Sequence, residues 1–334
     1  MRSKILIVGC GSIGERHLRC FQRTGRAEPV ACEVNSDVLR KVCETYRVTG
    51  FSSLDAALAA GRYDGAVVCT PAPSHIPVAC RLMQHGAHVL IEKPLSTTLA
   101  DVPQLRQTIT TTGRFCAVAY TYHFMPGIKA MREAVRSGRW GRPLQVIVAA
   151  GQHFPTFRPA YRTIYYARHE TGGGAIQDLL THFVNAMEWI VGPTTRVFVE
   201  AAHQFLDGVT VEDTVCLTAR HGEVLASYSI NQFQPPNEAL YQVHCEQGSL
   251  KYEYHEQRWA EWPRGAEAWQ HHPAPVKERD DLFVAQANAF LDAMTGRPTD
   301  LATVDEAVQT LRVNVANMES WRTGKPVEIE NIAN

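Results

Sequence analysis

The chain has 334 residues, of which 45% are hydrophobic and 20% are charged, and its formal net charge is −1. These values are those of an ordinary globular protein of about two domains. A nearly neutral chain lacks the basic surface that binds nucleic acid or an anionic membrane. Its longest apolar runs, such as residues 144–150, are far shorter than the ~20 residues of a membrane helix. We therefore expect neither nucleic acid nor a membrane among its partners.

The cysteines and the first residues bear on the compartment. Nine cysteines are scattered along the chain with no Cys-x-x-Cys spacing. That pattern favours reduced, mostly buried thiols over a disulfide framework or a zinc site, so we expect no metal centre. Arg2 and Lys4 precede an apolar run, as in a signal peptide, but the glycines and charges at residues 9–16 interrupt it. We expect a cytoplasmic protein.

The first 120 residues alternate short apolar runs with amphipathic stretches. Continuous apolar runs such as residues 67–69 and 89–91 are typical of strands covered on both faces. The alternation predicts an α/β domain over residues 1–121, a doubly wound parallel sheet of the Rossmann type. Strands are expected at 4–8, 29–33, 66–70, 88–91 and 115–120, with helices at 13–23, 36–46, 54–60, 75–85 and 101–112.

After residue 121 the rhythm changes, and strands follow one another without intervening helices. Such a run predicts a mostly antiparallel sheet, so we expect a second, α+β domain over residues 122–334. Its strands are expected at 143–152, 195–202, 211–219, 223–231, 240–246 and 249–254. Its helices are expected at 127–137, after the triple glycine at 172–174, and at 281–294 and 303–321.

A glycine-rich turn joins the first strand to the first helix. Glycines there allow a tight turn, a close approach of backbone to pyrophosphate and helix-to-strand packing, and the helix N-terminus favours negative charge. The motif alone is weak evidence, and a glycine turn that binds nothing is the alternative. Strand, helix and a later acid in register favour a dinucleotide site. The expected contacts come from Gly9, Gly11, Ser12, Ile13 and Gly14.

The choice of dinucleotide depends on Glu33, 19 residues after Gly14 at the end of the second expected strand. A carboxylate there can hold both ribose hydroxyls and would repel a 2′-phosphate. We therefore expect NAD, with NADP disfavoured. Arg40 and Lys41 oppose this preference, because either could reach a phosphate.

Three further residue types point to chemistry. Asp178 and His182 are four residues apart on the helix after the triple glycine and share one face with Thr181, Asn185 and Trp189. On spacing alone, a polar face in solvent is the better interpretation. Lys93, however, ends an apolar strand and precedes a proline. Lysine, carboxylate and imidazole together can hold an alcohol, remove its proton and let a hydride leave.

With these motifs in hand, the chain resembles the Gfo/Idh/MocA family of glucose–fructose oxidoreductase, inositol dehydrogenase and relatives. The resemblance rests on residues 9–14, Thr-Pro-Ala-Pro-Ser-His at 70–75, His-Val-Leu-Ile-Glu-Lys-Pro at 88–94, and residues 172–182. It implies a Rossmann domain followed by a domain whose large open sheet often forms a subunit interface, in a homodimer or homotetramer. It also implies NAD(P)-dependent oxidation or reduction of a sugar, cyclic polyol or related carbonyl.

The same resemblance implies roles for individual residues. Lys93 would contact the nicotinamide ribose and the reacting oxygen, Asp178 would support substrate and imidazole, and His182 would be the acid/base. A cis peptide is implied between Lys93 and Pro94. The family often has an arginine where this chain has His123, which leaves the substrate pocket, with Tyr122 beside it, open. Residues implied to line the cofactor are Thr70, Pro71, His75 and Glu92, together with Lys93.

Two loops are candidates for substrate or subunit contacts. Loop 153–168 is rich in tyrosines, which pack on sugar faces, and in arginines, which bind anionic groups. An ordinary polar loop or an oligomer contact is an equal alternative. Segment 255–280, rich in tryptophan, histidine and proline, is expected to be a long loop that acts as a lid or a subunit contact. The substrate candidates of the first loop are Arg158, Tyr161, Arg162 and Tyr165.

These observations predict a cytoplasmic NAD-dependent oxidoreductase acting on a secondary alcohol of a sugar or cyclitol. Two alternatives use the same residues. One is an NAD-dependent glycoside hydrolase that oxidises the sugar transiently, eliminates a substituent and returns the hydride. The other is a non-catalytic nucleotide sensor. Net accumulation of NADH distinguishes the dehydrogenase from the glycoside hydrolase, and any turnover excludes the non-catalytic sensor.

Overall fold

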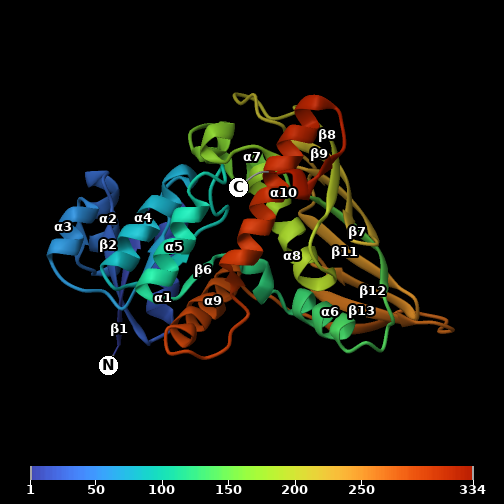
Figure 1. Cartoon of the computed structure of the whole chain (residues 1–334), viewed down its shortest axis with the longest axis horizontal. Helices are drawn as coiled ribbons and strands as arrows, with labels where there is room; N and C mark the ends of the chain where they lie inside the picture. Colours follow the sequence, from blue (N-terminus) through green and yellow to red (C-terminus); the bar gives the residue numbers. More distant parts are fainter. Residues whose placement is uncertain (1, 333–334) are drawn as a thin grey trace. The chain divides into compact units, whose positions relative to one another are not determined.

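The structure, a computed structural model, describes residues 2–332, which form two compact units (Figure 1). Residues 2–124 and 277–307 make the first unit, and residues 125–276 and 308–332 make the second. The expected boundary at 121/122 is close to the observed one, but residues 277–307 were assigned to the wrong domain. The return of this segment to the first unit is the main correction to the predicted domain organisation.

A seven-stranded sheet forms the centre of the first unit, in the order β15-β6-β5-β4-β1-β2-β3. Six strands are parallel, and β15 pairs antiparallel with β6. This confirms the expected parallel sheet. The strands are β1 (Ser3–Val8), β2 (Ala27–Cys32), β3 (Gly50–Phe51), β4 (Gly65–Val68), β5 (His88–Ile91), β6 (Cys116–Val118) and β15 (Ala302–Thr303).

The helices of the first unit lie on both faces of this sheet. Strand order runs from β1 to β2 in one direction and from β4 to β5 in the other, so right-handed crossovers place α1 and α4 on opposite faces. Helix α1 packs against α9, and α4 packs against α5. The order therefore reverses between β1 and β4, where such sheets bind ligands at the carboxyl ends of the strands. The helices are α1 (Ser12–Arg23), α2 (Ser36–Tyr46), α3 (Leu54–Ala59), α4 (His75–Gln84), α5 (Val102–Thr112) and α9 (Arg279–Ala293).

Helix α9 belongs to the first unit because its apolar side completes that unit's core. Phe290 and Leu291 are buried in one cluster with Ile5, Ile7 and Leu90 of the parallel sheet. Phe290 also meets the ring of Phe21 edge-on at 6.1 Å. Burial of such side chains is the dominant favourable term in folding. It therefore determines which unit α9 joins, although α9 follows residues of the second unit in the sequence.

The second unit is built on a nine-stranded sheet in the order β14-β13-β12-β11-β7-β10-β9-β8-β16. Only β7 and β10 are parallel among its described pairs, which confirms the expected mostly antiparallel sheet. The strands are β7 (Pro143–Gly151), β8 (Arg196–Ala202), β9 (Thr214–His221), β10 (Val224–Asn231), β11 (Glu238–Cys245), β12 (Gly248–Glu253), β13 (Arg258–Pro263), β14 (Gln270–Pro273) and β16 (Val327–Glu328).

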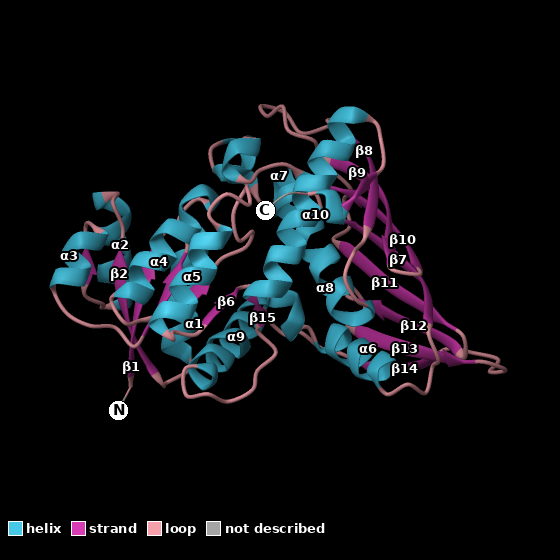
Figure 2. Ribbon diagram, viewed as in Figure 1, coloured by secondary structure: helices cyan, strands magenta, loops and turns pink. Residues whose placement is uncertain are grey.

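Helices of the second unit gather on one face of this sheet, as Figure 2 shows. Burial alternates residue by residue in β9 and β10, so one face is packed and the other is open. Ser320 of α10 accepts the main-chain N–H of Val199 at 3.0 Å and so ties that helix to β8. The longer helices are α6 (Pro126–Arg136), α8 (Thr181–Val191) and α10 (Val304–Thr323), whose first turn belongs to the first unit. Within residues 2–332 no helix is long and apolar enough to cross a membrane.

Segment 255–280 is a hairpin rather than the expected long loop. Strands β13 and β14 extend the sheet by two, with Trp259 stacked on His272 at 4.8 Å. The rings of Trp262 and Trp269 meet edge-on at 5.5 Å. Prolines 263 and 273 suggested a loop, but both are the last residues of their strands.

Candidate active site

The three glycines of the first turn have three different reasons to be glycine. Gly9 has φ +86°, and a Cβ there would lie 2.8 Å from the carbonyl of Cys69. A Cβ on Gly14 would overlap the Gly9 carbonyl oxygen, whereas one on Gly11 would have nothing within 4 Å. Gly9 and Gly14 therefore allow the turn and the packing of helix on strand. Gly11 leaves open space, so that a ligand can come close to the main chain there.

The first turn of α1 can hold an anion. Helix α1 begins at Ser12, and Gly11 caps it without a side-chain hydrogen bond. The N–H groups of Ser12, Ile13 and Gly14 precede the first intrahelical bond, from Glu15 N–H to Gly11 O at 2.8 Å. These donors, with the positive end of the helix dipole, fit a pyrophosphate.

Glu33 lies beside this turn, since its strand pairs with β1 up to Val8 and Cys32. Its carboxylate accepts the main-chain N–H of Cys10 at 2.7 Å and that of Asn35 at 2.9 Å. The side chain is thus fixed at the edge where a ribose would lie. The guanidinium of Arg40, which opposed the NAD preference, pairs with Asp37 at 2.8 Å.

Lys93 follows β5 at the same edge of the sheet. Its peptide with Pro94 is cis, as the resemblance implied. Before it, buried Glu92 accepts a hydrogen bond from Lys93's own N–H at 3.0 Å and contacts the imidazole of His17 at 2.6 Å. Burial raises the pKa of the Glu92 carboxyl, but His17 and the charge of Lys93 outweigh it and hold that pKa below its usual value.

After Lys93, the buried ring of His75 contacts the main chain. Its Nδ1 is 2.9 Å from the Pro94 carbonyl oxygen, and its Nε2 is 2.7 Å from that of Thr70. Burial lowers the pKa of His75 in spite of these two carbonyls. A neutral imidazole has one N–H, so it donates to one of them at a time. The side chain of Thr70, the residue before Pro71, also accepts a hydrogen bond from the Ser74 hydroxyl at 2.8 Å.

In the second unit, Asp178 and His182 lie on a helix whose polar side is buried. A π-helical turn (Ile176–Leu180) carries Asp178 and continues into α8, which carries His182. Asp178 is 2% exposed, Thr181 0% and Asn185 2%, while His182 is partly exposed. The interpretation of this stripe as a solvated face is therefore wrong.

Two side chains of loop 153–168 contact Asp178 directly. The Tyr165 hydroxyl donates to its Oδ1 at 2.7 Å, and Arg158 Nη1 is 3.5 Å from its Oδ2. Both residues were substrate candidates. The structure brings them to the carboxylate expected to act on substrate.

A buried acid that the sequence analysis missed holds the π-helical turn. Glu212 accepts the Ile176 N–H at 2.8 Å and contacts His169 Nε2 at 2.6 Å. Gly174 has φ +86°, and a Cβ there would lie 2.5 Å from the Glu212 carboxylate. In the sequence, Glu212 stands beside a second acid, Asp213, in a run of valines and threonines, which is weak evidence for contact with a turn 36 residues away.

The other substrate candidates have structural partners. Tyr161 is 1% exposed in an aromatic cluster with Phe154 and Tyr166, and its hydroxyl donates to Asp207 O at 2.8 Å. Arg162 donates to the same carbonyl at 2.8 Å. His123 is fully buried with its Nδ1 3.0 Å from Asp300 O. Tyr122, beside it on a short 3-10 helix, is partly exposed.

A doubly wound sheet with this glycine turn and acid defines a dinucleotide-binding protein. The chain belongs to the Gfo/Idh/MocA family. Residues 3–120 match the family described as "Oxidoreductase family, NAD-binding Rossmann fold". Residues 128–251 match the "GFO/IDH/MocA C-terminal domain".

Curated relatives are similar at low identity. D-apiose dehydrogenase of Paraburkholderia graminis is 27% identical over 222 residues, which cover 66% of this chain and 58% of that protein. The chain thus matches little more than half of this relative. 1,5-Anhydro-D-fructose reductase of Ensifer adhaerens is 26% identical over 275 residues, 80% of each chain.

Solved structures share the fold. The WlbA dehydrogenase of Bordetella pertussis, in complex with NADH and UDP-GlcNAcA, has a TM-score of 0.84 at 24% identity and covers 98% of this chain and 99% of its own. An oxidoreductase of Agrobacterium radiobacter, in complex with NAD+, L-tartaric acid and magnesium, has a TM-score of 0.86 at 16% identity over the full length of both chains.

Proposed function

We propose that this protein is an NAD-dependent dehydrogenase that acts on a secondary alcohol of a sugar, sugar derivative or cyclic polyol. The observation that carries the proposal is the Lys93 turn, which is fixed at the same sheet edge as the glycine-rich turn. Relatives named D-apiose dehydrogenase and inositol 2-dehydrogenase support the substrate class.

The residues of the first unit fit the dinucleotide. The N–H groups of Ser12, Ile13 and Gly14 would hold the pyrophosphate, and Glu33 would hold the adenosine ribose. NAD, when bound, supplies the acceptor for a hydride. Fixed by Cys10 and Asn35, the Glu33 carboxylate would repel a 2′-phosphate, which favours NAD over NADP.

The chemical step requires a base and a group that stabilises the reacting oxygen. We propose that His182 takes the hydroxyl proton as hydride leaves the carbinol carbon. Lys93 stabilises the negative charge that develops on that oxygen. Asp178 orients the imidazole and a neighbouring hydroxyl of the substrate, and Tyr165 and Arg158 hold that carboxylate in place.

Assembly and location follow as proposals of the same kind. The open face of the nine-stranded sheet carries Leu225 of β10, which is 48% exposed. We propose that this face pairs two copies of the chain in a homodimer or homotetramer. All nine cysteines are free, which supports a reducing, cytoplasmic location.

The direct test is NADH formation by the purified protein with a panel of sugars, sugar acids and cyclitols. The proposal predicts net NADH with at least one polyol, and faster turnover with NAD than with NADP. Release of free sugar from a glycoside without net NADH would favour the hydrolase. Binding of NAD with no turnover across the panel would favour the sensor. Faster turnover with NADP would contradict the role of Glu33.

A further inference from the structure

We propose that His17 is a positioning residue for Lys93. Its imidazole fixes the Glu92 carboxylate, and that carboxylate in turn holds the main chain at Lys93. The proposal rests on the proposed function, in which Lys93 touches both nicotinamide ribose and substrate oxygen. It assigns to the middle of α1 a role in turnover that is separate from the pyrophosphate site at the start of that helix.

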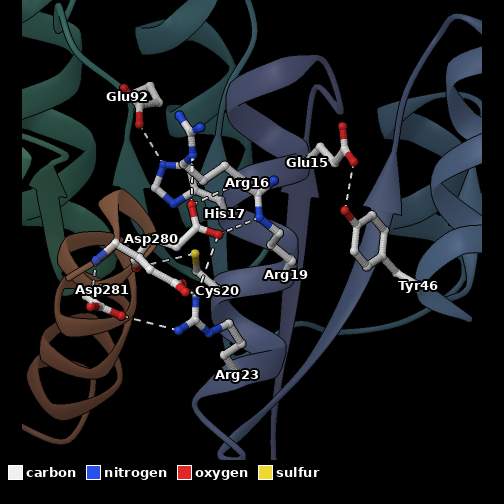
Figure 3. A network of polar contacts seen from close by, with 11 residues as sticks. Glu15, Arg16, His17, Arg19, Cys20, Arg23, Tyr46, Glu92, Asp280 and Asp281 are labelled. Atoms are coloured by element: carbon white, nitrogen blue, oxygen red, sulfur yellow. Dashed lines mark hydrogen bonds and ion pairs between the residues drawn. The ribbon is translucent and has the colours of Figure 1, made fainter.

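The imidazole of His17 contacts the Glu92 carboxylate directly, as the upper part of Figure 3 shows. Nε2 of His17 is 2.6 Å from Oε1 of Glu92, and the two residues are 1% and 5% exposed. Hydrogen bonds of this length to a carboxylate are the strong, geometrically strict ones. In a site this dry, the carboxylate cannot exchange the imidazole for water.

Glu92 also contacts the main chain of Lys93. The other carboxylate oxygen of Glu92 accepts the Lys93 N–H at 3.0 Å, so the peptide plane that begins Lys93 is fixed by the side chain before it. On the far side, His75 contacts the Pro94 carbonyl oxygen at 2.9 Å. The turn that presents Lys93 is therefore held at both ends by buried imidazoles, one from α1 and one from α4.

Helix α9 covers His17. Its ring meets Phe283 of α9 edge-on at 5.3 Å. Helix α9 is held on α1 by Asp280, which accepts Arg19 Nε at 2.6 Å, Arg19 Nη2 at 2.9 Å and Arg16 Nε at 3.1 Å (Figure 3). The hydrogen bond from Arg19 holds the pKa of the Asp280 carboxyl below its usual value. The late return of the chain to the first unit thus covers the imidazole and keeps the contact dry.

Stability alone is a poor reason for this pair. A buried ion pair is often matched or exceeded in stability by apolar side chains of similar size. An apolar pair at 17 and 92 could fill the same volume between α1 and β5. It would lack the acceptor for the Lys93 N–H, which is the feature that bears on the reaction.

Three variants test the proposal. His17→Phe keeps the ring against Phe283 but cannot donate to Glu92. His17→Gln keeps a donor near the position of Nε2, and His17→Asn is polar but too short. The matched control is His88→Gln, at the other end of β5, where the imidazole accepts the Phe115 N–H at 2.9 Å. Turnover is measured with the best substrate, and affinity is measured for NADH and for ADP, which lacks the nicotinamide ribose.

We expect His17→Phe and His17→Asn to lower kcat about 10- to 100-fold, the loss typical when a reacting group is displaced or its supporting partner removed. KM should change less, NADH should bind more weakly, and ADP should bind as in wild type. His17→Gln should recover most of the turnover, and His88→Gln should retain it. If the Phe variant does not fold, the Asn and Gln variants carry the same comparison.

Equal kcat in His17→Asn, His17→Gln and wild type would overturn the proposal, because it would show that His17 only packs. A parallel loss of NADH and ADP affinity would also overturn it, because it would place the damage at the pyrophosphate turn. If wild type turns over no polyol, the proposed function fails by itself. The ratio of NADH to ADP affinity then still decides whether His17 controls the position of Lys93.

Discussion

Tyr165 and Arg158 have a clearer role in the structure than in the sequence. Both were expected to bind substrate, and both contact the carboxylate of Asp178. A carboxylate held by a hydroxyl and a guanidinium has a fixed direction. Positioning of this kind raises the rate without adding a group to the chemistry.

Tyr165→Phe should lower kcat/KM by roughly 10- to 100-fold, because a hydrogen bond to a charged group is worth roughly 1.5–3 kcal/mol. Tyr161→Phe, in the same loop, should leave turnover near wild type and cost about 1 kcal/mol of stability, because its hydroxyl donates to Asp207 O inside the aromatic cluster. Steady-state kinetics and urea unfolding of both variants check this. The reverse pattern would restore Tyr161 as the substrate contact.

At the scale of elements, the π-helical turn Ile176–Leu180 is the least predictable part of the site. The expected spacing put Asp178 and His182 one ordinary helical turn apart. A π turn holds an extra residue, and it is stabilised by a hydrogen bond from Ile176 N–H to Glu212 across the unit. No local sequence pattern predicts a hydrogen bond between residues 36 positions apart.

Gly174→Ala tests whether this turn matters for activity. The substitution forces an alanine into φ +86° and its Cβ to 2.5 Å from the Glu212 carboxylate. We expect lower turnover and a loss of stability beyond the roughly 1–2 kcal/mol of left-handed strain. The control Gly113→Ala lies at φ +62° in the left-handed region with nothing within 4 Å of its Cβ, so it carries that strain without the clash. Equal effects of the two on kcat and Tm would rule out the clash.

His221 in β9 gives the second unit a pH-dependent stability. Burial lowers its pKa to about 4, against a small opposite effect of its hydrogen bond to Gly192 O. The folded imidazole stays neutral while the unfolded one gains a proton near its ordinary pKa of 6.5. Stability is therefore full above pH 6.5 and falls as the pH drops towards 4, by roughly 3 kcal/mol in total.

The measurement is Tm from pH 7 to 4 for wild type, His221→Gln and the exposed control His85→Gln. We expect the variant at 221 to flatten the acid side of the curve and the control to follow wild type. Identical slopes in all three proteins would contradict the burial argument.

The elements differ in how far the sequence predicts them. Alternating apolar and amphipathic stretches predict the parallel sheet, because periodicity is local. The glycine turn, Lys93 and the helix after Gly174 are also local motifs. His17 and Glu212 were missed because their partners lie 75 and 36 residues away. The hairpin after residue 257 is not predictable from composition, because its prolines, which usually indicate a loop, end strands here.

At the scale of the whole molecule, the order of the chain differs from the order of the units. The first unit takes α9 from residues that follow all but the last strand of the second unit's sheet, because the apolar side of α9 fits the core beside α1. Hydrophobic pattern predicts that such a helix exists. The hydrophobic pattern does not predict which core the helix joins, because that choice depends on shape complementarity.

The open face of the nine-stranded sheet is the proposed contact between copies of the chain. We expect light scattering to give the mass of a dimer or tetramer. Ser227→Arg, at an exposed position of β10, should shift the protein towards monomer, because it adds a charge to the proposed contact. Gln107→Arg, exposed on α5, is the control and should leave the mass unchanged. A monomeric wild type would contradict the proposed interface.

The central claim is that hydride moves from a carbinol carbon of the substrate to NAD, with His182 as the base. The most direct test uses a polyol substrate deuterated at that carbon and mass spectrometry of the nicotinamide product. We expect one deuterium in the NADH formed by wild type. We also expect a rate about 10²- to 10⁴-fold lower in His182→Ala, with NAD affinity unchanged. Deuterium that returns to the sugar with no labelled NADH, or a His182→Ala rate near wild type, would contradict it.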